Sequence, residues 1–254
     1  IADNKLSGQE ALRVADKLIA RDVDLAIEYQ IDHNVGGQIM NKFRLANTPV
    51  IAIDITMVGA TFFGIDNYRA GHDGGVAIGR WLLREWQGAF DRVLVLEEPR
   101  ARVLPAARIQ GQLDGMTQVL GEIQEERLIF LDSGNTSEIS EAEVRRTMEA
   151  LPDCNQIAVL SFNTDAAIGA LRAARHLDRE QHVVIVGQGA DRLLLEEVRQ
   201  SDSRIIGSTT YMPERYGAQL IQLALKILEG EPVPPAVYTD HVFIDVENID
   251  LYYP

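Results

Sequence analysis

Short apolar runs alternate with amphipathic stretches along almost the whole chain, and this alternation limits the folds open to it. The apolar runs are rich in Val and Ile and carry few charges, which is typical of strands covered on both faces of a sheet. We predict such strands at residues 25–27, 50–53, 62–65, 93–96, 128–131, 157–160 and 183–186.

Between these runs, apolar side chains recur at steps of three or four residues, as they do on the buried face of a helix. The clearest stretches lie at residues 11–19, 77–82, 168–174 and 220–227. Strand–helix–strand repetition predicts an α/β fold with parallel sheets flanked by helices and joined by right-handed crossovers.

The charge balance argues against several classes of partner. The 254 residues include 38 acidic and 24 basic side chains, which gives a net charge of −14. Because such a surface repels phosphate groups, we expect no nucleic-acid partner. No apolar run approaches the ~20 residues that span a bilayer, so we expect no membrane insertion.

Cys154 is the only cysteine, which excludes an internal disulfide and a cysteine-clustered zinc site.

No motif for catalysis is present, and the chain is predicted not to be an enzyme. It lacks the nucleophile elbow, the zinc-protease helix and the phosphate loop of nucleotide-binding proteins, and its five histidines are scattered. We therefore predict no metal and no cofactor. Gly187-Gln188-Gly189 is a partial dinucleotide fingerprint, but Arg192 occupies the third glycine position, which favours a simple tight turn. Gly71, Gly74, Gly75 and Gly79 share one helical stretch and predict close helix packing.

Polar residues directly follow the predicted strands, at the sheet edge where open α/β folds bind ligands. They include Glu28, Tyr29, Asp54, Asn163 and Gln188. Asp and Asn are also preferred helix caps, so capping and ligand contact both remain open for each such residue taken alone.

A series of motifs in fixed order then resembles one family. The segments are 48–54, 63–71, 106–111, 162–173, 183–187, 211–217 and 242–250. Together they resemble the type I periplasmic binding proteins of the ribose-binding kind, over nearly the whole chain. The resemblance implies two lobes, residues 1–65 with 212–239 and residues 66–211 with 240–254. It also implies that the family's first strand–helix–strand, roughly 40 residues, precedes Ile1 and is missing, which would leave the sheet of the first lobe partly uncovered.

The resemblance also implies a ligand site at the strand ends. In this family an aspartate, an arginine and an asparagine at the places of Asp54, Arg108 and Asn163 form hydrogen bonds with sugar hydroxyls. Two departures weaken the sugar pattern, because Ile55 stands where the family has an arginine and Gly189 where it has an aspartate. The predicted ligand contacts are Asp54, Arg108, Asn163, Tyr211, Glu28, Tyr29, Asn135 and Gln188. An unpaired Glu28 would favour a donor-rich or cationic ligand, and a salt-bridged or solvated Glu28 is the alternative.

The function implied by the resemblance is capture of a monosaccharide or related polyol in a cleft between lobes, with closure on the ligand. The partners would be the membrane subunits of an ABC importer, and the chain would be a monomer. Its location would be the periplasm after removal of a signal peptide, or the outer surface of a Gram-positive-type cell through a lipid anchor. One alternative is the effector-binding domain of a lac-repressor-type regulator, and another is a dehydrogenase built on the Gly187 turn.

Overall fold

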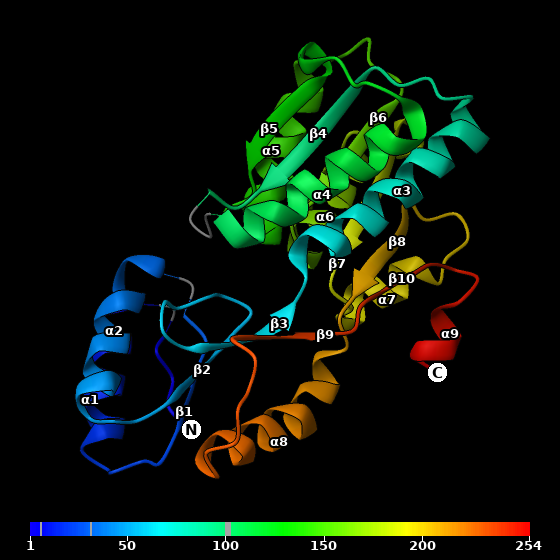
Figure 1. Cartoon of the computed structure of the whole chain (residues 1–254). Helices are drawn as coiled ribbons and strands as arrows, with labels where there is room; N and C mark the ends of the chain where they lie inside the picture. The colour runs from blue at the N-terminus through cyan, green and yellow to red at the C-terminus, as the bar shows by residue number, and fades with distance from the viewer. Residues whose placement is uncertain (6, 31, 100–102) are drawn as a thin grey trace. The chain divides into compact units, whose positions relative to one another are not determined.

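A computed structural model describes residues 1–5, 7–30, 32–99 and 103–254 (Figure 1). The chain forms two compact units. Unit 1 comprises Ile1–Asp66 and Met212–Asp240, and unit 2 comprises Asn67–Tyr211 and His241–Pro254. Each unit is built around its own parallel sheet, as the alternation in the sequence predicts.

Unit 1 contains a four-stranded parallel sheet in the order β1-β2-β3-β9. Its strands are β1 (Ala26–Glu28), β2 (Val50–Ile53), β3 (Thr61–Ile65) and β9 (Ala236–Thr239). Helices α1 (Gly8–Ile19) and α2 (His33–Leu45) pack on one face, and α8 (Tyr216–Leu228) packs on the other. A short 3₁₀ turn, η4 (Pro213–Arg215), precedes α8.

Strand β1 forms an edge of this sheet. Its apolar Ile27 is 40% exposed, whereas Ile51 and Phe63 on the neighbouring strands are fully buried beneath α8. The sheet of unit 1 is therefore partly uncovered at β1, as predicted.

Unit 2 contains a six-stranded sheet in the order β10-β8-β7-β6-β4-β5, in which β10 alone pairs antiparallel. Its strands are β4 (Arg92–Glu97), β5 (Leu128–Asp132), β6 (Ile157–Ser161), β7 (Val183–Gln188), β8 (Ile205–Thr210) and β10 (Val242–Ile244). Short 3₁₀ turns precede β5 (η2, Glu125–Arg127) and β7 (η3, Glu180–His182).

Helices cover both faces of this sheet (Figure 1). One face is packed by α5 (Ser137–Glu149), α6 (Thr164–His176), α7 (Arg192–Val198) and α9 (Ile249–Tyr252). The other is packed by α3 (Asn67–Trp86) and α4 (Val103–Leu120). This is the doubly wound arrangement expected of a parallel sheet.

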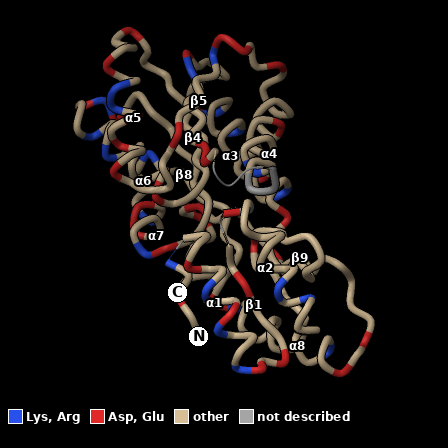
Figure 2. The backbone as a smooth tube through the Cα atoms, turned by 90° about the vertical axis from the view of Figure 1, so that its left-hand side faces the viewer, with Lys and Arg blue, Asp and Glu red and all other residues tan. Residues whose placement is uncertain are grey.

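Every strand predicted from the sequence is present, with ends that differ by at most two residues. Strands β2, β3, β6 and β7 contain no charged residue, and charged residues lie mainly on helices and loops (Figure 2). Strands β8, β9 and β10 were not predicted. Strand β8 reads IIGSTT and lacks the continuous Val/Ile run of the others, and β9 and β10 have only four and three residues.

Helices α3 and α4 approach each other closely along a line of glycines, Gly71 and Gly75 on α3 and Gly111 and Gly115 on α4, which we call the glycine seam. A methyl group at Gly71 would overlap the carbonyl oxygen of Arg108, and one at Gly75 would overlap that of Gln112. The prediction of close helix packing is confirmed at these two positions and at Gly79, where a Cβ atom would lie 2.9 Å from the side chain of Val119 on α4. Gly74 instead faces Gln188 and Thr209 beneath the helix.

The seam leads to a stability prediction. We expect Gly71→Ala to lower the free energy of unfolding by about 1–3 kcal/mol or more, because the added methyl group overlaps backbone that cannot move alone. Chemical denaturation measures this effect. The matched control is Gly217→Ala in α8, where nothing lies within 4 Å of an added methyl group. If the Gly71→Ala protein is as stable as the control, the close approach of the α3 and α4 backbones at Gly71 is contradicted.

Candidate functional site

Arg108 is the centre of a group of side chains in unit 2. Its side chain is 9% exposed. One terminal nitrogen (Nη1) donates to the carbonyl oxygen of Phe162 at 2.7 Å, and the other (Nη2) donates to Oδ1 of Asn67 at 2.8 Å. The guanidinium carbon lies 5.1 Å from the ring centre of Phe162 and 5.5 Å from that of Tyr211. The cation is thus held by two hydrogen bonds and two aromatic rings.

Four elements place these groups. Arg108 belongs to α4, whose backbone is set against α3 by the glycine seam. Asn67 is the first residue of α3, Phe162 directly follows β6, and Tyr211 directly follows β8. The carboxyl ends of parallel strands meet at one edge of the sheet, so this edge of unit 2 is the candidate site.

Asn163 and Asn135 form a second pair at the same edge. The Oδ1 atom of Asn163 accepts from the backbone N–H of Ala166 at 2.9 Å and caps α6. Its Nδ2 donates to Oδ1 of Asn135 at 2.6 Å. Asn163 is therefore a helix cap, and a role in ligand contact stays a prediction for both residues.

Gln188 lies behind the site rather than on its surface. Its side chain is fully buried, and its Nε2 donates to the carbonyl oxygen of Ala70 at 3.2 Å and to Thr209. The turn that follows contains Gly189 with φ of +105°, a conformation that favours glycine. A Cβ atom at Gly187 would lie 2.6 Å from Leu194, so packing and turn geometry explain both glycines.

In unit 1, Asp54 follows β2 with a left-handed backbone, φ of +57°. The hydroxyl of Tyr216 at the start of α8 donates to its Oδ1 at 3.4 Å. A Cβ atom at Gly64 would lie 2.7 Å from the same oxygen, so the glycine on β3 leaves room for this carboxylate. Ile55, at the place of the family's arginine, is buried.

Glu28 ends strand β1 as a buried carboxyl group that is 8% exposed. Its Oε1 is buried and has no hydrogen-bond partner. Burial raises the pKa of Glu28 above its ordinary value of 4.5, and a hydrogen bond with the side chain of Asn4 opposes that rise in part. The next residue, Tyr29, has an exposed side chain, and its carbonyl oxygen accepts from Asn4 at 2.8 Å.

Two residues beside Arg108 were not among the predicted ligand contacts. Asn67 is 6% exposed and Phe162 is 7% exposed, and both touch the guanidinium directly. Each directly follows a position at a strand end, Asp66 after β3 and Ser161 in β6. Their place just after a strand end is the signal that could have identified Asn67 and Phe162 as site residues.

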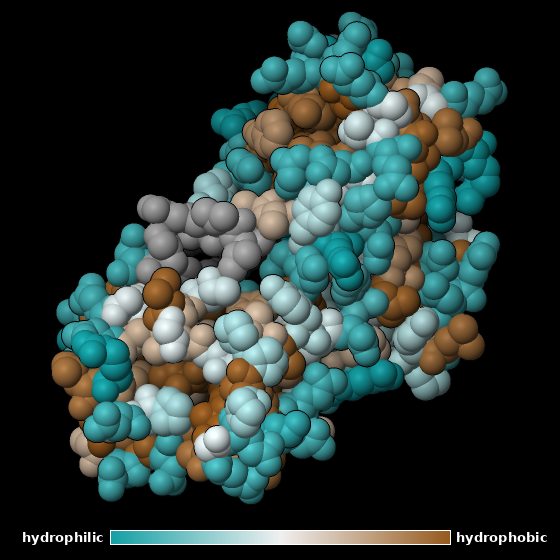
Figure 3. Space-filling view, viewed as in Figure 1, coloured by the Kyte–Doolittle hydropathy of each residue, from teal (hydrophilic) through white to brown (hydrophobic). Residues whose placement is uncertain are grey.

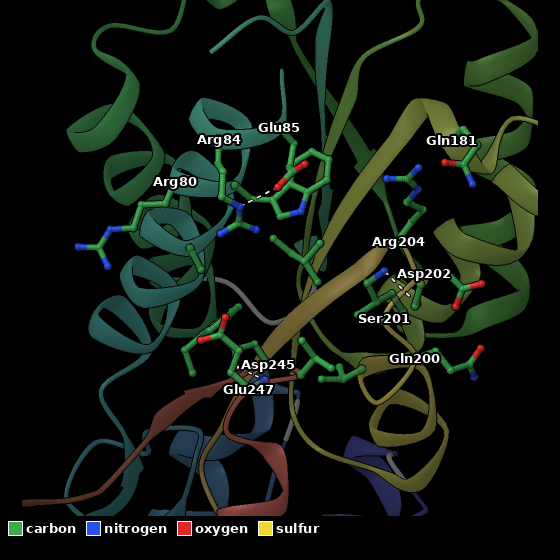
Figure 4. A pocket seen from close by; sticks show the side chains of 18 residues that line it. Arg80, Arg84, Glu85, Gln181, Gln200, Ser201, Asp202, Arg204, Asp245 and Glu247 are labelled. Carbon is green, nitrogen blue, oxygen red and sulfur yellow. Dashed lines mark hydrogen bonds and ion pairs between the residues drawn. The ribbon is translucent and has the colours of Figure 1, made fainter. Parts of the chain in front are cut away.

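The described residues of unit 2 line cavities at both ends of its sheet. The first, of about 540 Å³, is at the amino ends of the strands, where Arg204 precedes β8. Arg84 and Glu85 form an ion pair on one wall, and Asp202 and Arg204 lie on the other (Figure 4). The second, of about 250 Å³, is at the carboxyl ends and is lined by Glu97, Glu98, Phe130 and Phe162 among others. The second lies at the candidate site, because Phe162 lines it and also contacts Arg108.

Metal binding and membrane insertion are two other possibilities for the described part of the chain. No group of three His, Cys, Asp or Glu side chains there could hold a metal ion. None of its helices has the length and apolar character needed to cross a membrane.

Comparison with known proteins supports the architecture. The sequence profile of the periplasmic binding protein domain matches residues 1–232. A search of curated protein sequences finds no match.

Solved structures with similar folds include the following three. A periplasmic protein of an ABC transporter from Actinobacillus succinogenes, with bound D-allose, has 20% identity and a TM-score of 0.82 over 97% of this chain and 86% of its own. A solute-binding protein from Bacillus halodurans, with bound myo-inositol, has 17% identity and a TM-score of 0.83 over 99% and 84%. A protein from Mycobacterium smegmatis in complex with β-D-fucofuranose has 19% identity and a TM-score of 0.79 over 100% and 83%. These likenesses establish the two-lobed α/β fold of type I periplasmic binding proteins.

The raised pKa of Glu28 leads to a prediction on pH. A carboxyl group whose folded pKa exceeds its unfolded value favours folding while protonated, and this contribution is lost as pH rises through the folded pKa. We therefore expect Glu28→Gln to gain stability relative to the parent as pH rises above about 4.5.

Urea unfolding at a series of pH values measures this difference. Glu229→Gln, which changes the same charge at an exposed position after α8, is the matched control. A Glu28→Gln curve that runs parallel to the parent curve at all pH values would show that burial of Glu28 is not the cause.

Proposed function

Because the chain belongs to the family of periplasmic binding protein domains, we propose that it is a solute-binding protein that captures a small polar ligand for an ABC importer. The leading ligand class is a monosaccharide or related polyol. The arrangement around Arg108 carries this proposal, because it fixes a hydrogen-bond donor between aromatic rings at the carboxyl ends of parallel strands.

The chemistry of the strand-end residues suits a hydroxyl-rich ligand. A sugar hydroxyl both donates and accepts, so a buried sugar needs carboxylate or amide oxygens together with N–H donors. Asp54 in unit 1 offers acceptors, and Arg108 and Asn163 in unit 2 offer donors. Similar structures with bound D-allose, myo-inositol and β-D-fucofuranose support the same class of ligand.

The proposed mechanism is ligand-induced closure. A ligand that binds one conformation more tightly than the others shifts the population toward it. The membrane subunits of the importer would recognise that conformation. In this proposal the chain is not an enzyme and works outside the cytoplasm, as the family name indicates.

An exposed apolar surface favours a second candidate function. Ile221, Leu225 and Leu228 are spaced along the outer side of α8 and are exposed, as is Ile27 on β1. Figure 3 shows apolar side chains at the surface in this part of unit 1. Such surfaces often mark protein contacts, which suits the effector-binding domain of a lac-repressor-type regulator working as a dimer.

Size-exclusion chromatography separates the two candidates, because a monomer supports the transport protein and a tight dimer supports the regulator.

A thermal-shift screen of sugars, polyols, amino acids and nucleosides tests the main proposal. A ligand present at about 100 times its dissociation constant adds about 2.7 kcal/mol to the stability of the folded state. We expect a sugar or polyol to raise the melting temperature. Nicotinamide dinucleotides are included as a control, and a shift by these alone would support the dehydrogenase alternative.

The ligand contacts are tested by substitution. We expect Asp54→Ala and Arg108→Ala each to weaken binding of the ligand found in the screen by about 1.5–3 kcal/mol, because each removes charged hydrogen bonds. Isothermal titration calorimetry measures the loss. Asp153→Ala, which removes an exposed carboxylate from a loop of unit 2, is the control and should bind as the parent does. Unchanged affinity in either test variant would remove that residue from the site.

A further inference from the structure

The positive charge of Arg108 has only neutral hydrogen-bond partners. Its two hydrogen bonds end on a backbone carbonyl oxygen, that of Phe162, and on an amide oxygen, that of Asn67. Its Nε is buried and has no acceptor. Each terminal nitrogen carries two N–H groups, and one hydrogen bond is formed by each, so one N–H group on each nitrogen is still available.

No Asp or Glu in the described part of the chain forms an ion pair with Arg108. The two aromatic rings offset part of the cost of burying the charge, but they do not neutralise it. Residue 189 is a glycine, so it supplies no carboxylate beside Tyr211, although a Cβ atom there would lie 3.6 Å from the Tyr211 hydroxyl. Buried charges in proteins are usually paired, so this arginine is an exception that needs a reason.

Two acidic side chains at this edge of unit 2, Glu97 and Asp165, do not respond to the charge of Arg108. The pKa of Glu97 is raised by burial and by the neighbouring charge of Asp132. Burial, Asp191 and Glu138 raise the pKa of Asp165, and Arg172 is the cation that opposes the rise. Arg108 contributes to neither shift. Within the described residues, the hydrogen bonds of Arg108 therefore end on neutral groups, and its remaining N–H groups are available to a ligand.

We propose that the ligand carries a carboxylate group, as in an aldonate or uronate sugar acid, and that this group pairs with the free N–H groups of Arg108. The planar guanidinium matches a carboxylate in shape and charge, and hydrogen bonds between charged partners are about twice as strong as those between neutral ones. The inference rests on the proposed function and narrows its ligand class. A neutral sugar would leave the arginine without a counter-charge.

Calorimetry on the 254-residue chain with matched pairs tests this inference. The pairs are D-galactose and D-galacturonate, D-glucose and D-gluconate, and D-ribose and D-ribonate, with sodium acetate as a control for a simple anion. We expect one sugar acid to bind about tenfold or more tightly than its neutral partner, as charged hydrogen bonds imply. Added NaCl should weaken binding of the acid more than that of the neutral sugar.

Two variants assign the preference to its residue. Arg108→Gln should bring the two members of the pair within about twofold of each other, and Arg108→Lys, which keeps the charge but not the planar fork, should retain part of the preference. Arg192→Gln, on an exposed part of α7, changes the net charge equally and should leave the preference intact. Circular dichroism verifies that each variant is folded, and the comparison within the parent chain does not depend on any variant.

The outcomes separate this inference from the proposed function. If a neutral sugar binds as tightly as its acid, or more tightly, the inference that the ligand carries a carboxylate is wrong. The proposed capture of a sugar is then still supported. A preference that survives in Arg108→Gln overturns the role of Arg108. If no sugar, polyol or sugar acid binds, both the inference and the proposed function are wrong.

Discussion

The close approach of helices α3 and α4 is the constraint on which the candidate site of unit 2 depends. At the glycine seam the backbone of each helix lies against the backbone of the other, with Gly71 against Arg108 and Gly111 against Tyr68. Most helix pairs are separated by side chains, which can repack when one of them changes. At the glycine seam no side chain lies between the two backbones. The position of α4 along its axis and its rotation about that axis are therefore set by contact with α3. Arg108 is directly at this contact, and its guanidinium reaches back to Asn67 at the start of α3.

The strands that were predicted well from the sequence are those buried along their whole length by apolar neighbours. Strands β6 and β7 are buried along their whole length between two helical layers, so they read as unbroken apolar runs. Strand β8 is buried too, but its Ser208, Thr209 and Thr210 form hydrogen bonds to Gly189, Ala70 and Tyr253. A buried strand whose polar side chains are all paired cannot be told from a loop by apolar content alone. The short strand β10 forms because it pairs antiparallel with β8. Its own three residues do not reveal that partner, so the sequence pattern could not predict the strand.

The site was harder to predict than the fold, because the same residue types serve several roles at a strand end. Asn163 and Gln188 both follow the pattern of a ligand contact, yet Asn163 caps α6 and Gln188 supports Ala70 from inside the unit. Which role applies depends on where a side chain points relative to its neighbours, and a sequence pattern does not contain that. Arg108 was identified through its resemblance to a family motif. Its aromatic neighbour Phe162 was not, since an aromatic residue after a strand is more often part of a core.

An acidic chain and an anionic ligand are compatible because the two charge effects act over different distances. The net charge of −14 repels an anion at long range, but salt at physiological strength screens exposed charges beyond about 8 Å. At contact distance the proposed ligand would meet the buried guanidinium of Arg108, whose field is screened far less. The long-range term therefore acts mainly on the rate of association, whereas the local pair decides affinity and selectivity. In the proposed complex, the sign of the charge at Arg108, rather than the sign of the whole protein, would select the ligand.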